Sequence, residues 1–194
     1  MSALIAIAIA YLLGSLSSAI ILSKILKTPD PRTQGSGNAG ATNVLRISGK
    51  KEAALVLVGD ALKGLIAVWI GHAFFHLTPF TLGVVGFAAV AGHIFPVFFG
   101  FKGGKGVATA IGATMGLSFI SGLLMAAAWA AVAFVTRYSS LASMISMILG
   151  PVFLMFFSVS GFLIPSVMIA VLVIWKHKEN IAKLRSNTES KIVF

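Results

Sequence analysis

Residues 107–136 read VATAIGATMGLSFISGLLMAAAWAAVAFVT, thirty residues without a charged side chain. One helix needs only ~20 apolar residues to cross a bilayer, so this stretch is too long for a single straight crossing. We expect two short membrane helices here, with a break near Ser118–Gly122. The alternative is one tilted or bent helix.

The rest of the chain has the same apolar character. Of its 194 residues, 58% are hydrophobic and 10% are charged, whereas a soluble domain carries about 25% charged residues. A water-soluble fold could not bury so much apolar surface, and lipid is the solvent that suits it. We predict an all-α, polytopic transmembrane helix bundle that forms one domain over residues 1–194.

Further apolar segments lie on both sides of the opening stretch. They cover residues 3–23, 53–71, 80–99 and 140–176, the last with a break expected at Ser158–Gly161. Counting both broken stretches as two helices each gives about seven spans. Five spans is the alternative, with each long stretch counted as one helix. Both numbers are odd, so the two termini should lie on opposite sides of the membrane.

The basic residues decide the orientation. The chain has 15 Lys and Arg against 5 Asp and Glu, a net charge of +10. These cations gather in residues 24–51, 102–105 and 176–191, and loops rich in Lys and Arg stay in the cytoplasm. We therefore expect an outside N-terminus and a cytoplasmic C-terminus. The charge would suit anionic lipids or anionic substrates, and we expect no nucleic-acid partner.

The chain contains no cysteine and four histidines. Disulfides and thiolate chemistry are therefore excluded, and the histidines form no HExxH motif. We expect neither a metal site nor a cofactor.

The first polar segment contains GSGNAGATN, residues 35–43, followed by Arg46. Its glycines spell GxGxxG, but a membrane helix and a proline-rich linker precede them instead of the strand that a dinucleotide fold requires. We expect a loop with a short helix near 40–47. Its backbone N–H groups could bind an anion, and Arg46 could add a bidentate fork. The candidate donors are Ser36, Gly37, Asn38, Thr42 and Asn43. A flexible loop that caps a helix is the alternative.

The second segment is Gly103-Gly104-Lys105-Gly106. It is not a Walker motif, because Phe99 replaces the first glycine and Gly106 stands where Ser or Thr is needed. It still precedes a helix, and a helix N-terminus binds phosphate. The alternative is a tight, positively charged cytoplasmic turn.

The third segment starts at the end of the last span. If that span continues as a helix, His177 and Asn180 lie one turn apart on the same face. The lysines beside them could simply be anchors at the membrane surface. Ser139 and Ser140 are candidate helix caps, and Ser143 is a candidate ligand donor.

Two charged residues interrupt the second span. Asp60 and Lys63 lie three residues apart and share a helix face, which predicts a structural ion pair, although a charge within a span is a functional candidate by default. We expect His93 in the third span to make a hydrogen bond within the bundle rather than to act as a base.

Four sequence segments together resemble one enzyme family. They are GSGNAGATNVLR (35–46), GHIFPVFFGFKGGKGVAT (92–109), RYSSLAS (137–143) and HKENIAKLRSNTESK (177–191). In this order and spacing they are similar to the bacterial acyl-phosphate:glycerol-3-phosphate acyltransferases. The match departs from the family pattern at Lys183, where arginine is common, and at Asn187, where glycine is common.

The resemblance implies transfer of a fatty acyl group from acyl phosphate to the 1-hydroxyl of sn-glycerol 3-phosphate, the first acylation of phospholipid synthesis. It implies a monomer in the bacterial inner membrane, in contact with lipid, with its active site toward the cytoplasm. Carried over residue by residue, it makes Ser36, Arg46, Lys105, His177 and Asn180 important for activity. It makes Gly103, Gly104 and Gly106 part of a phosphate loop and gives Glu179 a structural role.

Two other functional classes remain possible from the residues alone. A transporter or channel for an anionic solute would suit the basic loops and the charges of the second span, but the chain shows no inverted repeat. A non-catalytic lipid-binding scaffold would leave the glycine loops without a purpose. No His-x4-Asp pair supplies a general base, so we expect the donor phosphate itself to accept the hydroxyl proton. The alternative is His177 as the general base.

Overall fold

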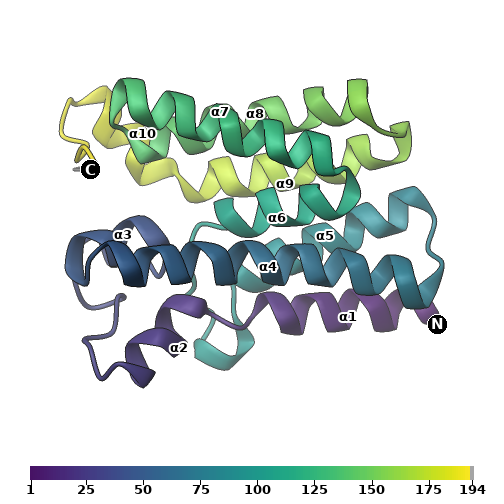
Figure 1. Ribbon diagram of the computed structural model, residues 1–194, viewed down its shortest axis with the longest axis horizontal. Coiled ribbons are helices and arrows are strands. Elements are labelled where there is room, and N and C mark those ends of the chain that lie inside the picture. Colours follow the sequence, from purple (N-terminus) through teal and green to yellow (C-terminus); the bar gives the residue numbers. More distant parts are fainter. Residues whose placement is uncertain (193–194) are drawn as a thin grey trace.

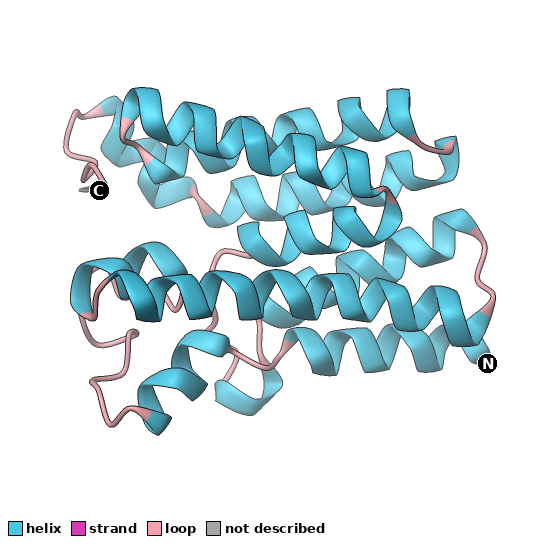
Figure 2. Ribbon diagram, viewed as in Figure 1, coloured by secondary structure: helices cyan, strands magenta, loops and turns pink. Residues whose placement is uncertain are grey.

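The computed structural model describes residues 1–192, and this part of the chain is entirely helical with connecting loops (Figure 2). Seven helices make up the bundle. They are α1 (Ser2–Gly14), α4 (Lys50–Phe75), α5 (Pro79–Ile94), α6 (Val107–Leu117), α7 (Phe119–Thr136), α8 (Ser139–Phe157) and α9 (Leu163–Lys176). Shorter helices connect them: α2 (Ser18–Ile25), α3 (Ala41–Ile47), η1 (Val97–Phe99), η2 (Ser160–Phe162) and α10 (Lys178–Arg185).

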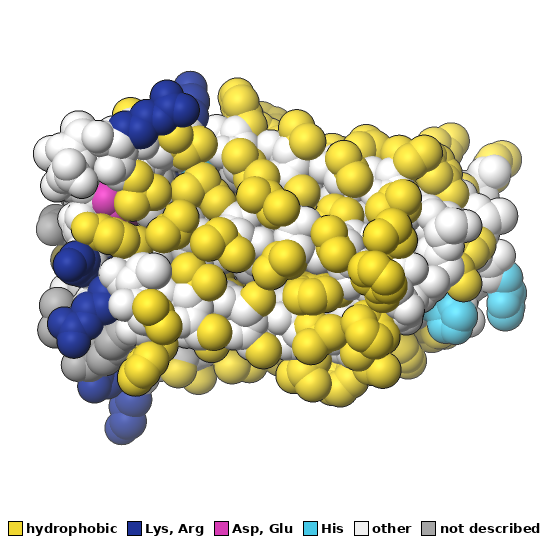
Figure 3. All heavy atoms as spheres, turned by 90° about the horizontal axis from the view of Figure 1, so that it is seen from above, with side chains coloured by type: hydrophobic (Ala, Val, Ile, Leu, Met, Phe, Trp, Pro, Cys, Tyr) yellow, Lys and Arg dark blue, Asp and Glu magenta, His cyan; other side chains and the backbone are white. Residues whose placement is uncertain are grey.

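The bundle has a polar end and an apolar middle. The N-terminus and α10 lie at opposite ends of the long axis, and α2 and α3 lie toward the same end as α10 (Figure 1). Lysine and arginine side chains gather at that same end, while apolar side chains cover the middle (Figure 3). Large apolar residues such as Leu4 (72% exposed) and Val135 (81% exposed) face outward. Lipid is the environment that such a surface requires.

Four helical segments are long and apolar enough to cross a membrane, and two bent pairs raise the number to six. The seventh apolar helix, α6, has 11 residues, which is short against the ~20 that a full crossing needs. The all-helical membrane fold is therefore confirmed. The count of seven crossings stays a prediction.

Both predicted helix breaks are present. Ser118 separates α6 from α7 and caps the second helix, because its Oγ accepts a hydrogen bond from the Ser121 backbone N–H at 3.4 Å. The chain leaves α8 at Ser158 and enters α9 through η2. At each break the chain reverses direction (Figure 1), so neither long stretch forms one tilted helix.

The first apolar segment differs from expectation. We predicted one helix over 3–23, but α1 and α2 are separate helices bent by 44°. The break leaves the carbonyl of Leu16 without a helical partner, and the ammonium of Lys63 donates to it at 2.7 Å. Ser17 then caps α2 through its contact with the Ile20 N–H. A buried lysine from α4 thus stabilises a break in α1–α2 that hydropathy alone did not reveal.

The predicted ion pair in the second span forms as expected. Lys63 Nζ lies 2.9 Å from Asp60 Oδ1, and both side chains are buried. Small residues allow the surrounding helices to pack closely, because a Cβ on Gly112 would collide with the carbonyl of Ala61, and one on Gly64 with that of Thr109. This contact fixes α6 against α4.

Candidate active site

The first glycine segment is shaped from the inside by Asn43. This side chain is 1% exposed, and its Oδ1 accepts a hydrogen bond from the Ser36 backbone N–H at 2.8 Å. Its Nδ2 donates to the carbonyls of Pro31 and Gln34, at 2.8 and 3.1 Å. We expected Asn43 to bind substrate, but its amide is already saturated within the loop. It supports the loop, whereas Ser36 and Gly37 are exposed on its outer side.

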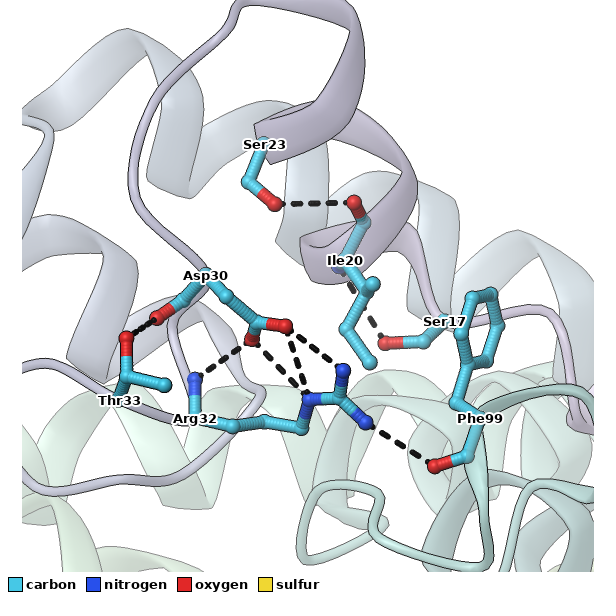
Figure 4. Close-up of polar contacts among 7 residues, drawn as sticks. All are labelled: Ser17, Ile20, Ser23, Asp30, Arg32, Thr33 and Phe99. Atoms are coloured by element: carbon cyan, nitrogen blue, oxygen red, sulfur yellow. Dashed lines mark hydrogen bonds and ion pairs between the residues drawn. The ribbon is translucent and has the colours of Figure 1, made fainter.

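A charged contact joins the residues just before this loop to η1. Asp30 and Arg32 form an ion pair at 2.7 Å, and Arg32 Nη1 donates to the Phe99 carbonyl at 3.0 Å (Figure 4). The hydrogen bonds from Arg32 lower the pKa of the Asp30 carboxyl. The guanidinium therefore holds the two glycine segments in a fixed relation to each other.

The second glycine segment folds back over the last turn of α5. The backbone N–H groups of Gly103 and Gly104 donate to the carbonyls of Ile94 and His93, at 3.3 and 3.2 Å. Gly104 also packs against the carbonyl of Ala39, so closely that a Cβ would lie 2.8 Å from that oxygen. The two predicted anion-binding loops are thus in direct contact, and Gly106 ends the second one at φ 88° immediately before α6.

Lys105 points from the second loop toward the C-terminal segment. Its ammonium donates to Asn180 Oδ1, and Asn180 Nδ2 donates to Glu189 Oε1 at 2.7 Å. Ser140 Oγ donates to the same carboxylate oxygen at 2.6 Å. Burial lowers the pKa of Lys105, while the carboxylates of Glu189 and Glu179 oppose the shift. Three distant segments therefore meet around one carboxylate.

The tail beyond α10 crosses this end of the bundle. Arg46 Nη2 donates to the Ser190 carbonyl at 3.2 Å, and the Ile192 N–H donates to the Arg137 carbonyl at 2.7 Å. Ile192 is 4% exposed among apolar residues of α7 and α8. Asn187 adopts φ 57°, a left-handed conformation that asparagine tolerates better than most residues. This explains how asparagine can stand where the family pattern has glycine.

The start of α8 lies beside the first loop. Thr42 Oγ1 and Ser139 Oγ are 2.9 Å apart, and Ser143 Oγ donates to the Ser139 carbonyl at 2.7 Å while accepting from Trp129 Nε1 at 3.1 Å. The expected serine cap is wrong, since Tyr138 occupies the cap position and makes no side-chain cap contact. Ser139 and Ser140 instead bond to the first loop and to the tail.

His177 lies at the bend between α9 and α10, which is 57°. Its Nδ1 contacts the Val173 carbonyl at 2.7 Å, so that nitrogen carries the proton and Nε2 is left as an acceptor. Burial lowers the pKa of His177 to about 4, and the charge of Lys105 acts in the same direction. The last span does not continue straight, and the structure shows no hydrogen bond between His177 and Asn180.

The other predicted residues fall in three places. Asn38 is half-buried in the first loop, Glu179 is exposed on α10, and the Asp60–Lys63 pair lies within the bundle. Glu189 was missed as a site residue, although an acid within a basic tail could have been recognised as a partner for nearby donors. Residues 1–192 contain no group of three or more metal-binding side chains.

Comparison with known proteins shows the family of this chain. The family model described as glycerol-3-phosphate acyltransferase matches residues 4–187. The chain belongs to this family. The acyltransferase is 52% identical to the glycerol-3-phosphate acyltransferase of Coxiella burnetii (strain Dugway 5J108-111), with 99% of both chains covered. It is 49% identical to that of Shewanella halifaxensis, over 94% of this chain and 91% of the relative.

A solved structure has the same fold as the acyltransferase. The crystal structure of PlsY (YgiH), an integral membrane glycerol 3-phosphate acyltransferase in its glycerol 3-phosphate form, superposes with a TM-score of 0.92 at 41% identity. The superposition covers 100% of this chain and 96% of the PlsY chain. A lysophosphatidic acid form of the same protein gives a TM-score of 0.90 at 40% identity. The acyltransferase is thus an integral membrane enzyme.

Proposed function

We propose that the protein transfers a fatty acyl group from acyl phosphate to the 1-hydroxyl of sn-glycerol 3-phosphate. The hydroxyl oxygen bonds to the acyl carbon, the bond from that carbon to the phosphate oxygen breaks, and the hydroxyl proton leaves with the phosphate. The products are lysophosphatidic acid and inorganic phosphate. The glycerol 3-phosphate and lysophosphatidic acid forms of the related PlsY support the acceptor and the product.

The arrangement around Glu189 carries the proposal. Its carboxylate accepts hydrogen bonds from Ser140 and Asn180, and Lys105 bonds to the same asparagine. Phosphate oxygens accept the same charge-assisted bonds as a carboxylate. Donors that hold an anion of this chain can therefore hold the phosphate of a substrate once the tail moves aside.

Charge and backbone geometry supply the rest of the binding site. Arg46 follows the first glycine loop and Lys105 lies within the second, and acyl phosphate and glycerol 3-phosphate both carry phosphate. We assign substrate contacts to the exposed side of the first loop, to the second loop and to the start of α8. These are Ser36, Gly37, Asn38, Thr42, Gly103, Gly104, Gly106 and Ser143. Apolar helix faces around the site would admit the fatty chain from the bilayer.

The proton acceptor is the donor phosphate. With a pKa of about 4, neutral His177 is a weak base, whereas a phosphomonoester-like group has a second pKa of ~6. The donor phosphate also lies beside the attacking hydroxyl in a productive pose, where it can accept the proton directly. His177 uses its free Nε2 to orient the substrate, and Asn180 holds the phosphate. Because acyl phosphate is an activated mixed anhydride, positioning and oxyanion stabilisation are sufficient for transfer.

A direct assay tests the proposal. Purified protein is given glycerol 3-phosphate with either an acyl phosphate or an acyl thioester of the same chain length. We expect lysophosphatidic acid and inorganic phosphate in equal amounts with acyl phosphate, and little product with the thioester. Faster turnover with the thioester would overturn the proposed donor while leaving the acyltransferase assignment intact.

A further inference from the structure

His93 lies directly beneath the second glycine loop. It belongs to the last turn of α5, is 5% exposed, and accepts the Gly104 N–H at its own carbonyl at 3.2 Å. The ring faces the same residue, because a Cβ on Gly104 would collide with His93 Nε2. The imidazole therefore occupies the space that any larger residue at position 104 would need.

The other ring nitrogen faces a buried carboxylate. His93 Nδ1 is 3.6 Å from Asp60 Oδ1, the oxygen that also forms the ion pair with Lys63. Within residues 1–192, Nδ1 makes no hydrogen bond. The bundle hydrogen bond that we expected of His93 is thus absent at Nδ1. Asp60 is itself held by Lys63, whose ammonium donates to the carbonyl at the α1–α2 break. One continuous polar chain runs from that break to the loop.

Such a chain is costly within a membrane protein. Ionisable groups inside a bundle are expensive to bury, and apolar side chains of similar volume often stabilise a fold at least as well as a buried ion pair. A carboxylate beside one ring nitrogen limits the orientations that a buried imidazole adopts, and so helps to fix the position of the other nitrogen. Here that nitrogen faces Gly104, next to Lys105.

We propose that His93 is a positioning residue for the second glycine loop: Asp60 orients the imidazole, and Nε2 supports Gly104 so that Lys105 meets the phosphate. This inference rests on the proposed function, in which the loop binds phosphate. The ring does not touch the reacting atoms. It sets the position of the group that does.

Two amide substitutions separate the two ring nitrogens. The amide of His93→Gln reaches about as far as Nε2, and the shorter amide of His93→Asn reaches about as far as Nδ1. We expect His93→Gln to keep the KM for glycerol 3-phosphate and the inhibition constant of inorganic phosphate near normal. His93→Asn and His93→Ala should raise both by about threefold to tenfold, because they remove the atom that packs against Gly104 and let the loop that carries Lys105 shift, with a smaller change in kcat.

Two further variants make the result unambiguous. Ser146→Ala removes another buried membrane hydrogen bond, from Ser146 Oγ to the Met125 carbonyl at 2.8 Å, and should lower thermal stability without raising the phosphate inhibition constant. Lys105→Ala should raise that constant strongly. If Lys105→Ala leaves it unchanged, the loop assignment of the proposed function is wrong. The positioning role of Nε2 is overturned if Lys105→Ala raises the phosphate inhibition constant but His93→Ala does not. It is also overturned if this constant stays near normal in His93→Asn but rises in His93→Gln.

Discussion

Lys105 and Lys102 are neighbours in one loop but differ in their surroundings. Lys105 is partly buried and bonds to Asn180, whereas Lys102 is exposed. We expect Lys105→Ala to lower kcat/KM at least tenfold, because a buried hydrogen bond to a charged group is worth about 1.5–3 kcal/mol. Lys105→Arg should restore little of the lost kcat/KM, since a planar guanidinium does not replace a compact ammonium. Lys102→Ala is the matched control, and steady-state kinetics is the measurement.

Arg46 should behave similarly if it binds phosphate. Within residues 1–192, Arg46 donates only to the backbone carbonyl of Ser190, so its removal costs the fold little. We expect Arg46→Ala to lose tenfold or more in kcat/KM with an unchanged melting temperature. Near-normal turnover in this variant would mean that the Arg46 charge contributes only to the orientation of the protein in the membrane.

The pH dependence of turnover separates His177 from the donor phosphate. Burial lowers the pKa of His177 to about 4, so the ring is neutral throughout the range from pH 5 to 8. A base works only when deprotonated, so turnover should fall as pH drops through the pKa of the base, at ~6 for a phosphate. We expect this fall to persist in His177→Gln, which should keep partial turnover. Complete loss in a folded variant that still binds substrate would identify the histidine as the base.

The same residues show how far the sequence could predict the site. Types and spacing predict Lys105, Asn180 and Ser36, and the structure brings Lys105 and Asn180 into contact, while the roles of all three toward substrate stay predictions. The sequence did not indicate that Asn43 bonds to its own loop, because such an asparagine and one in an exposed donor cluster look alike in sequence. Glu189 was missed since its partners, Ser140 and Asn180, come from separate segments that only the fold brings together.

At the scale of elements, the close packing of α6 against α4 positions the second loop, because that loop leads directly into α6. Gly112→Ala should push the helices apart, because the new Cβ collides with the Ala61 carbonyl. Gly86→Ala is the matched control, since its Cβ would meet only side-chain atoms at an ordinary 3.5 Å. We expect Gly112→Ala to lose about 1–3 kcal/mol of stability and to lose activity as α6 shifts. Thermal melting and turnover measure both effects, and equal behaviour of the two variants would contradict the close packing.

Helix breaks differed in how well they could be predicted. Those after Leu117 and Phe157 were found because each lies in an apolar stretch that is too long for one helix. The break between α1 and α2 was missed because residues 3–23 have the right length for one span. Lys63, forty-seven residues away from Leu16 in the chain, donates to the carbonyl at this break, and hydropathy cannot report such a tertiary contact.

At the scale of the whole molecule, the basic end should face the cytoplasm. Because the chain lacks cysteine, single cysteines can be introduced without a background signal. We expect Gln34→Cys to be protected from an impermeant thiol reagent in intact cells and His76→Cys, at the opposite end, to react. Labelling of Gln34→Cys from outside would show that the basic end faces away from the cytoplasm. Composition and loop charge predict this orientation, while the number of full crossings depends on α6 and is harder to derive.

The C-terminal tail has a practical consequence for anyone who prepares this enzyme. Ile192 is buried between α7 and α8 and bonds to Arg137, and Glu189 sits among the candidate phosphate donors. An affinity tag fused after residue 194 would disturb the packing of residues 189–192, which lie in or beside the candidate active site. A tag placed before Met1, at the far end of the bundle, leaves that segment untouched and is the better choice for purification.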